Sequence, residues 1–461
     1  MFHFKICMMK TNIFLAIGIG LSTLGCTAYL DVKPDRQMMV PNSLAHAELL
    51  LNDYNTMNLA FSTLGEIGTD DYYLTDANWK SISVIDERNT HVWSDEPIVL
   101  TTQWMNPYKV VYQANQILEV LAALDENEQP QSRFKQSKGA ALFFRGFAFH
   151  QLLNVFALAY DPATATELEG IPLRLDTDIG PSSGRASLED SYVQVIADFR
   201  EAVHLLPMAK MQDGLPWKAS AHAALARVYL DMGRFEEAYK YADSCLTIHD
   251  GLMDFNELTL SASLPIARFN EEVLFAAMTP TIGAMGQSFA KIDSTLYRSY
   301  DDLDLRKQAF FRSNTGANLG TYAFKGSYNN ATTGIFLGLT TSEMFLVRAE
   351  AACRLGHVNE ALDDLNTLLH NRWESGEYVE ETETDADRLL EKILLERRKE
   401  LVFRGRRWAD LKRLNLDSRF AKTLIRRVNG QEYTLPPNSP KYAVLIPEVV
   451  ISESGIKQNK R

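Results

Sequence analysis

Apolar residues recur at three- and four-residue steps along much of the chain, the spacing that places side chains on one face of an α-helix. The pattern is clearest at residues 107–124, 138–156 and 192–207. In the second of these segments, Phe144 and Ala148 belong to one such stripe. We therefore predict a mainly α-helical protein.

Two further segments have the pattern of a helix pair with a glycine at the turn. They are residues 222–247, with Gly233, and residues 342–370, with Gly356. Glycine suits a tight turn because it tolerates a positive φ angle. The pattern resembles tetratricopeptide helix pairs, but contiguous repeats of that kind recur about every 34 residues. The two pairs are therefore predicted to be separated by a large insertion.

Helical periodicity is weak in residues 45–105 and 250–340, which are rich in aromatic residues. The second segment is also rich in glycine, serine and threonine. We predict loop-rich insertions in both places. Binding residues often lie on loops that a rigid scaffold holds in position.

The chain has 461 residues and a formal net charge of −12. This charge argues against a nucleic-acid partner, which usually requires a basic surface. Of the four cysteines, Cys7 and Cys26 lie in the N-terminal segment, which we interpret below as an export signal that ends before Cys26. Cys245 and Cys353 each fall on an apolar helical stripe, so we expect two buried thiols; a disulfide between them is the alternative.

The N-terminus has the composition of an export signal. Lys5 and Lys10 provide positive charge, residues 13–21 form a short apolar run, and Cys26 follows Gly25. The run is shorter than the roughly 20 apolar residues that span a bilayer. We predict a lipoprotein signal peptide over residues 1–25 with lipid on Cys26, a simple secretory signal being the alternative.

We find no H-E-x-x-H or G-x-x-x-x-G-K motif in the sequence. The nine histidines include no pair at metal-ligand spacing. We therefore expect no catalytic residues, no metal-site motif and no cofactor; whether a metal ion assists ligand binding stays open.

Residues 395–413, LERRKELVFRGRRWADLKR, combine many basic residues with interleaved acids and apolar residues. A basic helix that binds nucleic acid is one interpretation. The interleaving instead favours an ion-pair network that fixes a helix and a turn at Gly405. Glu400 and Arg404 are four residues apart, a spacing that brings side chains together on a helix.

This segment and several others resemble the SusD/RagB family of outer-membrane lipoproteins. The others are the signal ending at Cys26, Ala114-Asn115, KGAALFFRGFAFHQLL at 138–153, Gly170-Ile171-Pro172-Leu173, Ile446-Pro447 and Gln458-Asn459. The chain departs from the family pattern at Ala140, Gly146 and Arg404. The resemblance covers about residues 26–459 and implies a SusD-like domain over 26–461. Its N-terminal part would span about 26–240 and its C-terminal part about 250–461.

The resemblance implies a non-catalytic cell-surface lipoprotein that captures oligosaccharides. It also implies that these pass to a SusC-like TonB-dependent transporter in the outer membrane, typically in the Bacteroidota. Two alternatives stay open: a RagB-like peptide-binding lipoprotein of the same fold, and a tetratricopeptide-type adaptor that binds proteins. The membrane leaflet that carries the lipid also stays open.

Proteins of this family bind glycans by stacking sugar faces on aromatic rings, with polar groups fixing the orientation. No motif assigns individual contacts, so the candidates rest on composition and on their place in the loop-rich segments. Asp70 and Asp71 are candidates for binding sugar hydroxyls or a cation. The aromatic candidates are Tyr72, Tyr73, Trp79, Trp93, Tyr297, Tyr300, Tyr322 and Tyr328.

Overall fold

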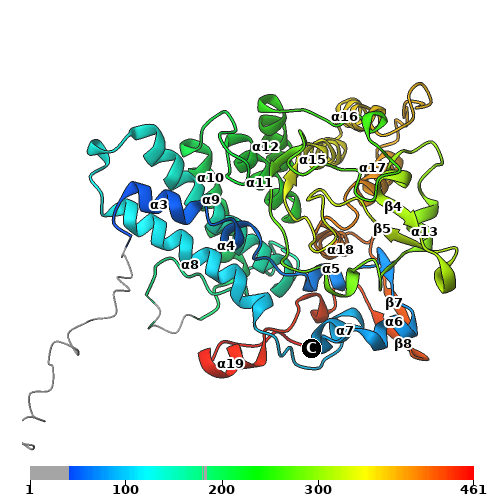
Figure 1. Ribbon diagram of the computed structural model, residues 1–461, viewed down its shortest axis with the longest axis horizontal. Coiled ribbons are helices and arrows are strands. Elements are labelled where there is room, and N and C mark those ends of the chain that lie inside the picture. Colours follow the sequence, from blue (N-terminus) through cyan, green and yellow to red (C-terminus); the bar gives the residue numbers. More distant parts are fainter. Residues whose placement is uncertain (1–40, 179, 181–183) are drawn as a thin grey trace, which may run out of the picture. The chain divides into compact units, whose positions relative to one another are not determined.

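The computed structural model describes residues 41–178, 180 and 184–461. The predicted signal peptide and Cys26 lie outside the described residues. No helix in the described ranges is both long enough and apolar enough to cross a membrane. Figure 1 shows long helices in one layer and short helices and strands along one side of it.

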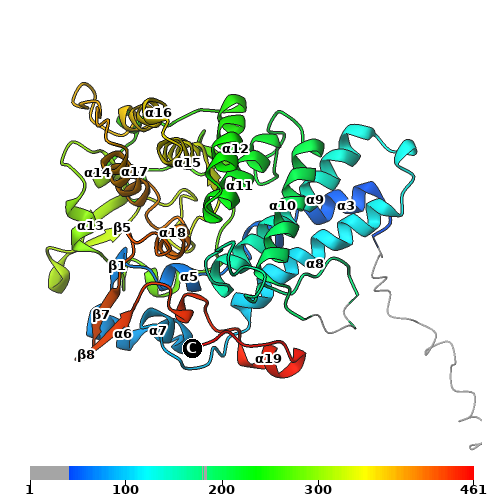
Figure 2. The same cartoon turned by 180° about the vertical axis from the view of Figure 1, so that it is seen from behind.

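The helical layer is built from eight helices, each of which packs against its neighbour in chain order. Figures 1 and 2 show the series running from α8 and α9 at one end to α16 and α17 at the other. The predicted mainly α-helical fold is therefore confirmed. The helices are α8 (Thr102–Ala122), α9 (Gln131–Phe156), α10 (Leu188–Leu205), α11 (Lys218–Asp231), α12 (Phe235–Ile248), α15 (Thr341–Arg354), α16 (Val358–His370) and α17 (Ala386–Glu400).

Both predicted turn glycines lie between paired helices. Gly233, with φ +70°, separates α11 from α12, and Gly356, with φ +86°, separates α15 from α16. The two pairs are distant in sequence but adjacent in space, because α12 packs against α15. Arg348 on α15 donates to Asp243 on α12, with Nη1 and Oδ1 2.7 Å apart. The insertion thus leaves the helical layer and returns to it.

The segments predicted to be loop-rich contain short helices and short strands. The strands of the described residues pair into two-stranded antiparallel sheets: β1 with β3, β2 with β6, β4 with β5, and β7 with β8. The short helices are α3 (Leu44–Leu51), α4 (Tyr54–Asn58), α5 (Leu64–Ile67), α6 (Asp76–Ser81), α7 (Ile85–His91), α13 (Ser294–Arg298), α14 (Arg306–Phe310), α18 (Arg407–Leu414) and α19 (Glu448–Ser454). The strands are β1 (Tyr72–Tyr73), β2 (Val273–Phe275), β3 (Lys291–Ile292), β4 (Phe311–Ser313), β5 (Tyr322–Phe324), β6 (Leu339–Thr340), β7 (Leu424–Val428) and β8 (Gln431–Leu435).

The main core lies between α9 and the elements around it. Phe143 on α9 packs edge-on against Phe275 on β2, with ring centroids 4.7 Å apart. Helix α9 is buried on nearly all sides from Gly139 onward, which explains its run of apolar residues. Cys245 and Cys353 are buried and not joined by a disulfide, as expected.

The predicted ion-pair network of residues 395–413 is confirmed. Arg397 Nε lies 3.0 Å from Asp410 Oδ2, and Arg413 Nη1 lies 2.6 Å from Glu350 Oε1. Gly405 has φ +69°, and a Cβ atom there would meet the Leu337 side chain at 2.1 Å. This position therefore requires glycine for both conformation and space.

One part of that prediction is corrected. Helix α17 ends at Glu400, so Arg404 does not lie one helical turn beyond it. Arg404 instead places its guanidinium 3.6 Å from the centre of the Tyr328 ring and donates to Thr340. Glu400 accepts hydrogen bonds from Arg306 and Arg372.

Candidate functional site: an aromatic surface

Four of the eight candidate aromatic residues lie in the core rather than at the surface. Tyr72, Trp93, Tyr300 and Tyr328 are between 1% and 6% exposed. Each also donates its polar hydrogen to a group inside the protein: Ile67 O, Gly68 O, Lys399 O and Glu272 Oε2, respectively. Their rings present no face to a ligand in this structure, so we remove these four from the candidate site.

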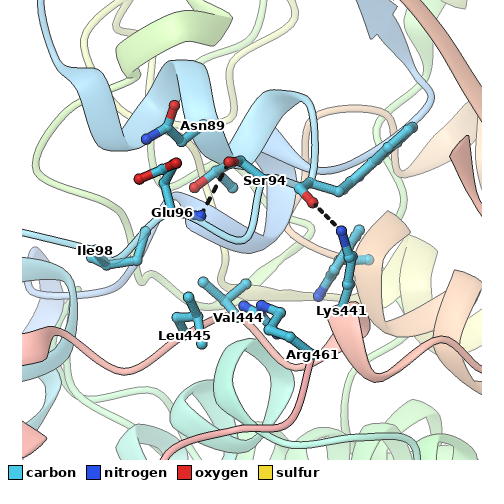
Figure 3. A pocket seen from close by; sticks show the side chains of 11 residues that line it. Asn89, Ser94, Glu96, Ile98, Lys441, Val444, Leu445 and Arg461 are labelled. Atoms are coloured by element: carbon cyan, nitrogen blue, oxygen red, sulfur yellow. Dashed lines mark hydrogen bonds between the residues drawn. The ribbon is translucent and has the colours of Figure 1, made fainter. Parts of the chain in front are cut away.

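Trp93 lines a small cavity, shown in Figure 3. Lys441 Nζ donates to the Trp93 carbonyl oxygen at 3.1 Å, and Ser94 Oγ accepts from Glu96 N at 3.1 Å. The cavity volume is about 20 Å³. A cavity of roughly 10–15 Å³ holds one water molecule, so this cavity has no room for a sugar ring.

The other four candidates reach the surface. Tyr73 is 37% exposed, and Trp79, Tyr297 and Tyr322 are partly exposed. They lie on β1, α6, α13 and β5. We call these four residues the aromatic surface.

Tyr297 and Tyr322 form its centre. Their rings are stacked, with centroids 3.5 Å apart and planes 13° from parallel. Helix α13 places Tyr297 because Asp293 caps that helix, accepting a hydrogen bond from Leu296 N at 2.8 Å. Strand β5 places Tyr322, and Phe311 on the neighbouring strand β4 packs edge-on against Tyr297. Two parts of the chain thus hold one two-ring platform.

Strand pairing places Tyr73 opposite the strand that leads into α13. Tyr73 is the cross-strand partner of Lys291 on β3, and Asp293 N donates to Asp71 O at 2.9 Å. Strand β3 continues into α13, and β3 also lies beside β5. Burial raises the pKa of Tyr73, and the charge of Asp293 adds to this, so the hydroxyl stays protonated at neutral pH.

Trp79 lies at the edge of the aromatic surface. The preceding residue, Asn78, donates to Phe289 O at 2.7 Å, which ties α6 to the segment that leads into β3. The indole nitrogen of Trp79 donates to Arg88 O at 3.2 Å, and the Arg88 guanidinium lies 5.8 Å from the ring centre. This cation limits access to one face of the ring.

Asp70 and Asp71 are held in ion pairs. Arg407 Nε lies 2.7 Å from Asp70 Oδ1, and Arg398 Nε lies 2.8 Å from Asp71 Oδ1. Burial raises the pKa of Asp70, but Arg407 and Arg398 outweigh it and hold the pKa well below its usual value. Both carboxylates thus fix the 395–413 segment, and we remove them from the candidate ligand contacts. Among the described residues, no three His, Cys, Asp or Glu side chains are grouped to hold a metal.

Two larger hollows lie away from the aromatic surface. One is an apolar groove of about 750 Å³ between α8, residues 172–176 and α19, where Met105, Tyr112 and Val449 are exposed. The other, of about 680 Å³, lies beside the α11–α12 turn and is lined by charged residues such as Arg354 and Asp417. Neither contains any of the eight candidates.

Comparisons with known proteins agree with the fold. A family model described as "Starch-binding associating with outer membrane" matches residues 28–230. A second, described as "SusD family", matches residues 269–444. The chain belongs to the SusD/RagB family. The resemblance predicted from the short motifs is therefore confirmed.

Individual relatives are distant. SusD-like protein P2 of Formosa agariphila is 22% identical over 391 residues, which cover 72% of this chain and 74% of that protein. A SusD superfamily protein from Bacteroides vulgatus has a TM-score of 0.75 at 20% identity, and the match covers 91% of this chain and 99% of that one. A SusD-like carbohydrate binding protein from the same species has a TM-score of 0.68 at 21% identity, with coverages of 90% and 97%. At these identities the structures show the shared fold alone.

Proposed function

We propose that this protein is a non-catalytic lipoprotein of the outer membrane that captures oligosaccharides on its aromatic surface. A lipid on Cys26 would hold it to the membrane, and a SusC-like TonB-dependent transporter would receive the ligand. Family membership supports the membrane location and the class of ligand, since one matching family model is described as starch-binding and outer-membrane-associated.

The observation that carries the proposal is the stacked Tyr297–Tyr322 pair. A sugar ring has an apolar C–H face that packs on an aromatic ring, while its hydroxyls need hydrogen-bond partners beside that ring. The pair is partly exposed and held from two sides, so its position is set before a ligand arrives. Pre-organised groups bind more tightly because less conformational entropy is lost on binding.

The phenolic hydroxyl of Tyr73 and the side chain of Gln287 are the polar groups that would contact the hydroxyls of a ligand. Gln287 is partly exposed and donates to Phe324 O at 2.8 Å, which fixes its amide close to β5. Gln287, which is not one of the eight aromatic candidates, is therefore added to the proposed site. No sequence motif marks Gln287, and only the approach of residues 287–292 to β5 identifies it.

The test is a titration of the purified protein with a panel of oligosaccharides and peptides, with product analysis in the same samples. We expect saturable oligosaccharide binding without products, measured by calorimetry. Binding of peptides alone would move the protein to the RagB-like alternative. Turnover of any ligand would contradict the non-catalytic assignment. Recovery of an outer-membrane barrel protein in a pull-down would support delivery to a transporter.

A further inference from the structure

The Tyr297–Tyr322 stack is asymmetric, because both faces of the Tyr297 ring are covered. Tyr322 covers one face, with the ring centroids 3.5 Å apart and the planes 13° from parallel. The ammonium group of Lys307 also lies over the Tyr297 ring, 5.2 Å from its centre. Tyr322 already fills the space over the first face, so Lys307 lies over the second. Tyr297 therefore has no free face on which a sugar could stack.

Neighbouring groups hold Tyr297 and Lys307 in this arrangement. Lys307 Nζ lies 2.6 Å from Asp302 Oδ1, and 16% of the Lys307 side chain is exposed. Phe311 packs edge-on against Tyr297, with ring centroids 5.7 Å apart and planes at 67°. The backbone N–H of Tyr297 donates to Asp293 O at 2.9 Å. Tyr297 is thus fixed by its helix, by a ring edge and by a cation.

Tyr322 has the outer position in the stack. In the part of the chain that the structure describes, no second aromatic ring and no cation lies over its ring. Its side chain is partly exposed. It follows the turn between β4 and β5, where a Cβ atom on Gly320 would meet nothing within 4 Å beyond its chain neighbours. Of the four ring faces in the stack, the outer face of Tyr322 is the one left for a ligand.

Ser313 lies beside this ring on the neighbouring strand. It is the cross-strand partner of Tyr322, and residues that are directly opposite project to the same face of a sheet. Asn314 N donates to Thr321 O at 2.9 Å, so the next pair along the ladder is a hydrogen-bonded one. Because the two kinds of pair alternate, Ser313 and Tyr322 form a non-hydrogen-bonded pair, whose side chains are closer together. Ser313 is exposed, and its hydroxyl has no partner among the described residues.

Strand alternation decides which other side chains of β4 accompany Ser313. Phe311 projects to the same face as Ser313 and is buried there under Tyr297. Arg312, the cross-strand partner of Ala323, projects to the opposite face. Strand β4 therefore places an uncharged hydroxyl, and not a guanidinium, next to the Tyr322 ring.

We propose that Tyr322 is the ring on which a neutral sugar unit stacks, that Ser313 hydrogen bonds to a hydroxyl of that unit, and that Tyr297 is a positioning residue. The inference rests on the proposed function and deepens it by assigning roles within the same site. The outer face of Tyr322 packs on the C–H face of the sugar. The Ser313 hydroxyl can both donate and accept, as a sugar hydroxyl can. Tyr297 supports Tyr322 from behind, so less side-chain entropy is lost on binding.

The test compares alanine with leucine at each tyrosine. The probes are maltohexaose, cellohexaose, laminarihexaose and mannohexaose, titrated by calorimetry into the purified protein. We expect Tyr322→Ala and Tyr322→Leu each to weaken binding about tenfold, because leucine has no aromatic face. Tyr297→Ala is expected to weaken it roughly fivefold, and Tyr297→Leu to recover most of that loss, because supporting Tyr322 requires only apolar bulk. Unfolding curves establish that each variant is folded.

A second comparison tests the hydroxyl. Ser313→Ala is expected to weaken binding roughly three- to tenfold, the typical contribution of one hydrogen bond. Thr434→Val is the matched control, since Thr434 is an exposed residue on β8, in a different two-stranded sheet, opposite Ile425. Its affinity should equal that of the wild type.

An equal loss in Tyr297→Leu and Tyr322→Leu would show that Tyr297 contacts the sugar and would overturn its positioning role. Wild-type affinity in Tyr322→Leu or in Ser313→Ala would overturn the contact assigned to that residue. In these cases the wild-type protein still binds an oligosaccharide, so the proposed function stands. Absence of binding to every oligosaccharide, in these probes and in the wider panel, would overturn both proposals.

Discussion

Replacing Glu400 by alanine is expected to lower the free energy of unfolding by about 3–5 kcal/mol, the typical cost of breaking a buried ion pair. Glu400 is fully buried and lies 3.0 Å from Arg372 Nη2 and 3.3 Å from Arg306 Nη1. Without it, two guanidinium groups with no exposed surface lose part of their charge compensation. Urea unfolding followed by circular dichroism measures the change.

The matched control is Glu432→Ala. Glu432 pairs with Arg427 at 2.8 Å on the β7–β8 hairpin, where the Arg427 side chain is 79% exposed. An exposed pair of this kind contributes about 0–1 kcal/mol, because water and salt screen it. Similar, small losses in both variants would contradict a structural role for the buried network.

The double replacement Tyr297→Ala/Tyr322→Ala is expected to weaken oligosaccharide binding by about 100-fold. Each aromatic contact at the centre of a binding site contributes roughly 1–2 kcal/mol, and the two rings support each other in one stack. Both rings are partly exposed, so we expect the protein to stay folded. Calorimetric titration with the tightest-binding oligosaccharide measures the effect.

Tyr112→Ala is the control for that experiment. Tyr112 is 42% exposed, similar to Tyr73, but lies in the apolar groove beside α19. We expect its affinity to equal that of the wild type. A loss in Tyr112→Ala, with no loss in the double variant, would place the binding site in the groove.

The helices and the charged segment were predictable from local sequence. Apolar periodicity predicted α9, which carries Phe144, and α16, because regularly spaced apolar residues indicate a buried helix face. The interleaved acidic residues in 395–413 correctly predicted that this segment forms ion pairs. The individual partners depend on long-range contacts: Glu400 meets Arg306 and Arg372, which are remote from it along the chain.

The candidate site was only partly predictable, and Tyr72 and Tyr73 show why. Successive residues in a strand point to opposite faces, so one of the two had to point inward. Which one is decided by the pairing with β3 and by Phe403, whose ring packs against Tyr72 at 5.9 Å. Composition identifies an aromatic-rich segment, whereas burial of each ring depends on segments far away in sequence.

The most direct test of the central claim is amide hydrogen exchange with and without the tightest-binding oligosaccharide. The account predicts slower exchange in residues 72–80, 287–298, 311–313 and 322–324, which form and surround the aromatic surface. Protection confined to residues 101–112 and 448–456, along the apolar groove, would contradict it.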